Sequence, residues 1–202
     1  MNIRKLVCSA VVSAVAAVAV LGTTQAAGAT TSPQLADELG SLWTAVLQTP
    51  SAQNSFGTGG SAYECWNLGG NVVAPFGPSG ATSCTVTSQT RLFVAGATVE
   101  CSTPWEVPAG TDLASCAADG DARKAPKVSV DGLPVALTEV ATSVQPVRVP
   151  LAPARNVFGL PGGTGQFAAH GWVILLDPLT PGEHVIVGPT FRTTITVRPA
   201  VN

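Results

Sequence analysis

Apolar residues early in the chain recur at a helical period. Leu35 begins a stripe that repeats every three or four residues up to Leu47, and this spacing places the stripe on one face of a helix. Ser32 and Pro33 predict the start of the helix, as N-cap and first helical residue, and Pro50 predicts its end. A helix with one apolar stripe must bury it, so we expect it to lie on one face of a sheet.

Short apolar runs separated by turn residues follow in the second part of the chain. Their lengths and spacing are typical of a β-sandwich or barrel. Residues 51–83, before these runs, are rich in Gly, Ser, Asn and Pro and predict mostly irregular structure. The predicted fold is mainly β: an immunoglobulin-like or related β-sandwich with one N-terminal amphipathic helix and disulfide-stapled hairpins. The expected strands are 85–94, 97–107, 111–117, 127–130, 134–138, 144–151, 172–176, 184–187 and 191–197.

The N-terminal segment predicts a signal peptide. Arg4 and Lys5 form a short basic start, an apolar run follows, and residues 27–29 have the small-x-small pattern of a cleavage site. The run is shorter than the roughly 20 residues that cross a bilayer. We therefore expect cleavage near Ala29, a secreted protein, and no transmembrane segment in the mature chain. The expected organisation is a signal peptide (1–29) and a single secreted domain (30–202) with a leader helix (30–50), a loop-rich segment (51–83) and a β-sandwich (84–202).

The charge of the mature chain narrows the classes of partner. Arg4 and Lys5 lie in the removed segment, so the ten basic residues fall to eight, against twelve acidic ones. A nucleic-acid or anionic-lipid surface needs clustered Lys and Arg, and we therefore expect neither partner. Charged residues make up only 11% of the chain, compared with about 25% in an ordinary domain. The surface must then consist largely of Thr, Ser, Gly, Gln and Pro, as in a turn-rich exported β-protein.

Four cysteines remain after cleavage, and an even number in an exported chain is typical of two disulfides. A turn signal at 108–110 predicts a hairpin in which Cys101 lies opposite Cys116. Cys65 and Cys84 then pair across the loop-rich segment, although the two other connectivities stay open. No C-x-x-C spacing occurs and neither histidine is near a cysteine in sequence, so we expect no metal site.

Several segments together resemble a family of uncharacterised secreted bacterial proteins. The clearest is a P-L-x-P-G-E-H-x-I corner at 178–186, which follows a Gly-aromatic strand at 171–176 and precedes an alternating strand at 191–197. The resemblance does not extend to the cysteine and glycine pattern of 55–83. The family carries no established activity, so the resemblance implies the fold and the export alone. Earlier segments that agree with it are 43–50 with Asn54, 91–96, 107–110 and 131–135.

The corner itself predicts structure rather than catalysis. Pro181 fixes φ and Gly182 accepts a positive φ, which together make a tight reversal into a strand. Adjacent side chains on a strand point to opposite faces, so Glu183 cannot orient His184 as a catalytic base. We predict a structural corner formed by these four residues.

Catalytic motifs do not emerge elsewhere, and no cofactor is expected. The sequence has no G-x-S-x-G nucleophile elbow, and the glycine-rich segment 162–165 predicts a flexible loop rather than a phosphate site. The acidic pair Asp119 and Asp121 lacks the further carboxylates of a complete calcium loop and predicts a solvated turn, although weak calcium binding by Asp112, Asp119 and Asp121 beside Cys116 stays open. Glu100 and Glu106 on one extended strand would lie roughly 20 Å apart, too far for glycoside hydrolysis.

Three tryptophans are candidate ligand-facing aromatics: Trp66, Trp105 and Trp172. Flat rings of this kind bind sugars or peptides, although core packing is the more common role. The leading hypothesis is a secreted, non-catalytic binding or envelope-associated module with an extracellular ligand, a glycan and a protein being the candidates. The alternative is a secreted hydrolase that acts on polysaccharide or ester, with carboxylates brought together by the fold.

Overall fold

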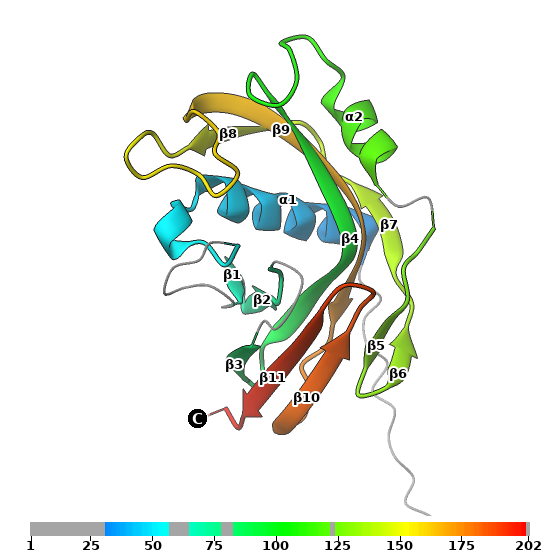
Figure 1. Cartoon of the computed structure of the whole chain (residues 1–202). Coiled ribbons are helices and arrows are strands. Elements are labelled where there is room, and N and C mark those ends of the chain that lie inside the picture. The colour runs from blue at the N-terminus through cyan, green and yellow to red at the C-terminus, as the bar shows by residue number, and fades with distance from the viewer. Residues whose placement is uncertain (1–30, 57–64, 78–82, 122–123, 201–202) are drawn as a thin grey trace, which may run out of the picture.

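The computed structural model describes residues 31–56, 65–77, 83–121 and 124–200 (Figure 1). The expected signal peptide (1–29) and its cleavage site lie outside these residues. Within them the chain forms two β-sheets and two α-helices. The fold is therefore a mainly β, two-sheet sandwich with an N-terminal helix, as the apolar pattern predicts.

The two sheets draw their strands from different parts of the chain. The large sheet has the order β1-β2-β4-β9-β7, and β8 also pairs with β9. Its strands are β1 (Trp66–Gly69), β2 (Val72–Ala74), β4 (Arg91–Thr103), β7 (Thr138–Ala141), β8 (Gln145–Val149) and β9 (Gly163–Leu176). The small sheet has the order β3-β11-β10-β5-β6. Its strands are β3 (Ser83–Thr87), β5 (Val128–Val130), β6 (Leu133–Val135), β10 (Gly182–Val187) and β11 (Arg192–Arg198).

Helix α1 (Ser32–Gln48) covers one face of the large sheet (Figure 1). Its predicted apolar stripe is buried, with Leu39, Leu42, Val46 and Leu47 fully inaccessible. The N-cap is Thr31, whose Oγ1 accepts a hydrogen bond from Gln34 N, so the predicted cap at Ser32 is wrong by one residue. The stripe packs against apolar residues of β4, β8 and β9 and forms the larger of the two main cores.

Two asparagines close the C-terminal end of α1 in the same way. The side-chain amide of Asn54 donates to the carbonyls of Val46 and Thr49, and that of Asn156 donates to the carbonyl of Leu47. Each asparagine also accepts a hydrogen bond from the backbone N–H two residues later. Carbonyls at a helix end lack partners within the helix, and these two buried amides supply them.

The small sheet packs against the opposite face of the large sheet. The core between the sheets contains Leu92 and Val94 of β4, Ile186 of β10 and Ile195 of β11. Phe93, between the two β4 residues, packs instead with α1. The first half of β4 is thus buried on both faces, which explains its continuous apolar sequence.

A β-bulge at Gly96 divides β4 into two halves. The pairing of β4 with β9 shifts between Ala95 and Ala97, so one residue of β4 is extra at this point. Before the bulge the odd-numbered residues face α1; after it, the even-numbered residues do. Glu100, for example, lies opposite Ala169, which packs in the α1 core.

The two disulfides join Cys65 to Cys84 and Cys101 to Cys116, the pairs that the hairpin argument indicated. The predicted strand at 111–117, however, is wrong. Residues 113–120 form helix α2 (Leu113–Gly120), with Asp112 as its N-cap, and the second disulfide ties this helix to β4. Apolar residues at 113 and 117, four apart, place one helical face against the sheet.

Three other local predictions differ from the structure. The strands expected at 85–94 and 97–107 are replaced by β3 and the single long strand β4, because the bulge absorbs Gly96 without a turn. The segment expected to be irregular contains β1 and β2, and the glycine-rich segment 162–165 lies largely in β9.

Candidate functional site

An apolar groove of about 710 Å³ runs along β5 and β6 and the segments on either side of them. The side chains that line it are mostly aliphatic, and only Lys127 and Ser129 contribute polar side-chain atoms. The lining contains no carboxylate, imidazole or thiol, so these residues offer no acid–base pair. The lining residues are Ala125, Pro126, Lys127, Val128, Ser129, Gly132, Pro134, Val135, Ala136, Leu137 and Val187.

Strand β6 borders the groove and is an edge strand of the small sheet. A two-residue turn with positive φ at Asp131 and Gly132 connects it to β5, so Val130 and Leu133 form the hydrogen-bonded pair beside the turn. The backbone of the next residue, Pro134, therefore faces away from β5, toward the open edge. Proline has no N–H to donate, and this edge is poorly suited to adding a further strand.

A second cluster of polar groups forms where the chain turns back after β4. The backbone N–H groups of Glu106 and Val107 both donate to the Ser102 carbonyl, at 3.1 Å each. Glu106 Oε2 then accepts hydrogen bonds from Ser102 N at 3.1 Å and from Ser102 Oγ at 3.0 Å. The carboxyl group of Glu106 also lies close enough to Glu100 to raise the pKa of Glu100. The prediction that the two glutamates lie about 20 Å apart is wrong, because the strand ends at Thr103.

Glu100 is the most perturbed carboxyl group of this cluster. Glu100 is only 9% exposed. Burial raises the pKa of its carboxyl group to about 8, and the neighbouring Glu106 carboxylate adds to this rise. A hydrogen bond from Ser102 acts in the opposite direction. With this raised pKa, Glu100 is mostly protonated at neutral pH. Glu100 Oε2 is nevertheless buried and accepts no hydrogen bond.

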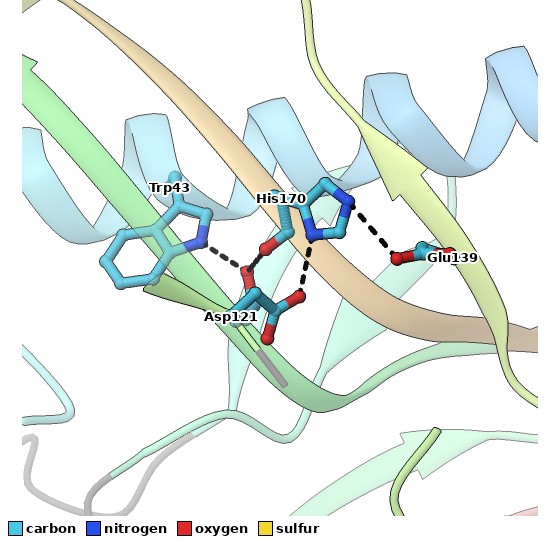
Figure 2. A network of polar contacts seen from close by, with 5 residues as sticks. Trp43, Asp121, Glu139 and His170 are labelled. Carbon is cyan, nitrogen blue, oxygen red and sulfur yellow. Dashed lines mark hydrogen bonds and ion pairs between the residues drawn. The ribbon is translucent and has the colours of Figure 1, made fainter. Parts of the chain in front are cut away.

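His170 lies between two carboxylates on the opposite face of the large sheet (Figure 2). Its Nδ1 is 2.8 Å from Asp121 Oδ2, and its Nε2 is 3.6 Å from Glu139 Oε1. The side chain of Asp121 is only 2% exposed, so the predicted solvated turn at this residue is wrong. With a carboxylate at each ring nitrogen, the imidazole of His170 links the end of α2 to β9 and β7.

The same network connects both faces of the sheet. Trp43 of α1 donates from Nε1 to Thr98 Oγ1 at 2.9 Å, and this hydroxyl donates to the His170 carbonyl at 2.8 Å (Figure 2). The tryptophan contributes its indole to the core and satisfies its one donor through the strand. This arrangement links α1 to the two central strands of the large sheet.

The C-terminal corner has the geometry expected of a structural element. Gly182 has a φ of 144°, and β10 begins at this residue. His184 Nδ1 lies 2.7 Å from Asp131 Oδ2, and Nε2 lies 2.8 Å from the Thr180 carbonyl. The hydrogen bond with Asp131 raises the pKa of His184 and lowers that of Asp131. Pro181 and Glu183 are exposed beside this link.

The three candidate tryptophans do not form a row. Trp66 is 7% exposed and donates from Nε1 to the Phe76 carbonyl, so it belongs to the core. Trp105 is half-buried, and its Nε1 donates to the Gly162 carbonyl at 3.2 Å. Trp172 lies on β9, opposite Glu139. They come from β1, the turn after β4 and the C-terminal part of β9, and only Trp66 and Trp105 pack in the α1 core.

Sequence reasoning missed both the groove and the carboxyl cluster. The groove depends on how the β5–β6 hairpin lies beside β10, which no local motif encodes. The cluster had one detectable signal, a Pro-Trp-Glu turn directly after a strand that carries Glu100 and Ser102.

Among the described residues, no helix is both long and apolar enough to cross a membrane. No protein-family model, no curated protein and no solved structure matches the chain. The resemblance to a secreted bacterial family therefore remains a prediction.

Proposed function

We propose that this protein is an exported binding module whose ligand is a small amphipathic anion held in the groove along β5 and β6. The observation that carries the proposal is the groove itself. Its volume of about 710 Å³ lies within the range of roughly 300–1,000 Å³ that is usual for small-molecule sites. Its aliphatic lining suits a hydrocarbon chain or ring.

The charge in the lining supports an acidic ligand. Lys127 is the one charged residue among the lining residues, and it is exposed. An ammonium group at the rim of an apolar site attracts a carboxylate, sulfonate or phosphate head group while the groove takes the apolar body. Because Pro134 leaves the neighbouring edge without a donor, an extended peptide that adds to the sheet is the less suitable occupant.

The alternative function, a hydrolase acting on polysaccharide or ester, would have to use Glu100 and Glu106. Glycosidases hold their two carboxyl groups about 5–9.5 Å apart, so that sugar or water fits between them. Here Glu100 is buried, and Glu106 Oε2 is occupied by hydrogen bonds from Ser102 N and Ser102 Oγ, so neither group is free to face a sugar. The geometry therefore favours binding over hydrolysis.

Ligand displacement tests the binding proposal. The anionic fluorophore 1-anilinonaphthalene-8-sulfonate serves as the reporter, with octanoate and octan-1-ol as matched competitors. We expect both to displace it and octanoate to bind more tightly. The variant Lys127→Gln should weaken octanoate about three- to tenfold, as expected for one exposed charge contact, and leave octanol unchanged. Lys124→Gln, an exposed lysine outside the lining, is the control.

A space-filling variant tests the location. Ala136 is exposed and lines the groove, so Ala136→Phe should fill the groove without disturbing the core. Ala141→Phe places the same ring at an exposed position of β7 outside the lining and should bind normally. Equal binding by the two variants, or no displacement by either competitor, would contradict the proposal.

The exported state has its own test. If the N-terminal segment is a signal peptide, the secreted form begins at Thr30, or directly after Ala27 as the second choice. N-terminal sequencing of protein recovered from the medium decides between them, and a mature form that retains Cys8 would show that export by this route is wrong.

A further inference from the structure

Glu100 leaves one buried oxygen without a hydrogen-bond donor. Its Oε2 accepts no hydrogen bond, although the residue is 9% exposed and the other polar contacts of the cluster are well formed. A buried carboxyl oxygen without a partner destabilises the fold. A hydrogen-bond donor or a bound cation can remove this cost. The unpaired Oε2 atom therefore suggests that Glu100 has a further partner.

The polar side chains near Glu100 carry oxygen ligands. The bulge at Gly96 turns Glu100 and Ser102 to the same face of β4, and the turn after the strand brings the exposed Glu106 back beside them. Two carboxylates and a hydroxyl group form a hard donor set, typical of Ca²⁺ and Mg²⁺ sites and not of zinc or copper sites, which use nitrogen or sulfur.

We propose that Glu100, Ser102 and Glu106 form a calcium-binding site at the end of β4. Glu100 supplies the inner carboxylate, Glu106 the outer one, and Ser102 a neutral ligand or the hydrogen bond that orients Glu106. Water completes the coordination on the exposed side of Glu106. Calcium is favoured over magnesium because it accepts irregular geometry and carboxylates at varied angles, whereas Mg²⁺ requires near-ideal octahedral coordination.

The donor set also sets the expected affinity. Sites with few carboxylates and several waters bind calcium with dissociation constants of about 10⁻⁴–10⁻³ M. Binding there would tie the turn at 104–107 to the strand without involving the groove along β5 and β6. This proposal is independent of the function proposed above, and either one can fail alone.

Thermal unfolding at pH 8.5 provides the test. In 5 mM CaCl₂ we expect the melting temperature of the wild-type protein to rise by about 2–8 °C relative to NaCl of equal ionic strength. The rise in 5 mM MgCl₂ should be smaller. Calorimetric titration with CaCl₂ should give one site per chain.

The variants Glu100→Gln and Glu106→Gln should abolish both effects. Gln resembles the protonated carboxyl group in size, so Glu100→Gln should fold. Glu183→Gln, which neutralises an exposed glutamate of β10, should respond to calcium like the wild type. If a glutamine variant fails to fold, the carboxylate stretching bands in the infrared spectrum of the wild-type protein provide a second measurement, since calcium coordination shifts them. No response to 20 mM calcium, or an equal response in Glu100→Gln, would overturn the proposal.

Discussion

Strand β4 has two halves on either side of Gly96 that differ in composition and packing. From Leu92 to Ala95 every side chain is buried, with α1 on one face and the small sheet on the other. Beyond the bulge, Glu100 and Ser102 occupy the α1 face, and only a small cluster around Cys101 covers the opposite one. One continuous strand thus contains a buried apolar part and a part with buried polar side chains.

The difference shows what a bulge can do within a single strand. An extra residue reverses which alternate positions face the helix, so an unchanged alternation in the sequence gives two different surfaces. The same residue lies against the groove: a Cβ on Gly96 would lie 2.5 Å from Leu137 Cδ1 and 3.0 Å from Pro126 Cγ, both in the groove lining. The bulge therefore positions the carboxyl cluster on one side and the groove wall on the other.

The largest effect should come from the first half of β4. Phe93 is fully buried, and Phe93→Ala should lower the free energy of unfolding by about 3–5 kcal/mol because it removes the ring and leaves a cavity. Val99 in the second half is only half-buried, and Val99→Ala should cost about 1 kcal/mol. Urea unfolding followed by tryptophan fluorescence measures both, and similar costs would show that the two halves do not differ in packing.

Removal of the disulfide in the second half ranks next. The bond between Cys101 and Cys116 closes a loop with a sequence separation of 15, and replacing both residues by Ala should cost about 3 kcal/mol. The loss should be local, with hydrogen exchange accelerating in α2 and remaining slow in β10 and β11. The double alanine variant of Cys65 and Cys84 is the control, since it should leave α2 protected. Uniform acceleration across both sheets would contradict a division of β4 into two halves.

Substitution at the bulge should have an intermediate effect on both sides at once. Gly96→Val places its side chain against Leu137, Pro126 and Val128, and it should cost about 1–3 kcal/mol through overpacking. Because these neighbours line the groove, octanoate binding should weaken as well. Ala97→Val, at the next and half-exposed position, should leave binding unchanged. Normal octanoate affinity in Gly96→Val would show that the bulge does not shape the groove.

The fold could be predicted largely from local patterns in the sequence. The α1 stripe from Leu35 to Leu47 and the alternation of β10 and β11 are signals within one element, and the structure confirms them. Helix α2 was missed because its short apolar spacing at 113 and 117 also fits a strand of the same length. The β4 bulge was missed because an extra residue leaves no mark on the apolar pattern.

The candidate sites were harder to predict because they depend on contacts between distant residues. Asp121 and His170 are 49 positions apart, and nothing in the sequence pairs them. The separation of about 20 Å expected for Glu100 and Glu106 requires that the strand continue beyond Thr103. The strand instead ends there, and the turn at 104–107 brings Glu106 back toward Ser102. The identity of the charged partner of His184 likewise required the register of β5 with β10.

The smallest expected effect on stability comes from the accessible pair of His184 and Asp131, in contrast to the buried Glu100 of β4. His184 forms hydrogen bonds through both ring nitrogens, to Asp131 and to the Thr180 carbonyl, and its pKa is raised above 6.5 chiefly by Asp131. A raised folded-state pKa means that the contribution to stability is complete below pH 6.5 and is lost as the pH rises through the folded value. The pKa of Asp131 is lowered below 3.8, so its contribution is lost as the pH falls through that lower value.

The pair should therefore stabilise the corner most between about pH 4 and pH 6.5. We expect the difference in unfolding free energy between the wild-type protein and His184→Gln to be larger at pH 5.5 than at pH 8.5. The change should be at most about 1 kcal/mol, because solvent screens an exposed pair. Glu100 also changes the unfolding free energy with pH in this range, but it does so equally in the wild-type protein and in the variant. The difference between the two proteins therefore excludes its contribution. Urea unfolding at the two pH values measures the difference, and an equal value at both would show that the His184–Asp131 contact contributes no charge-dependent stability.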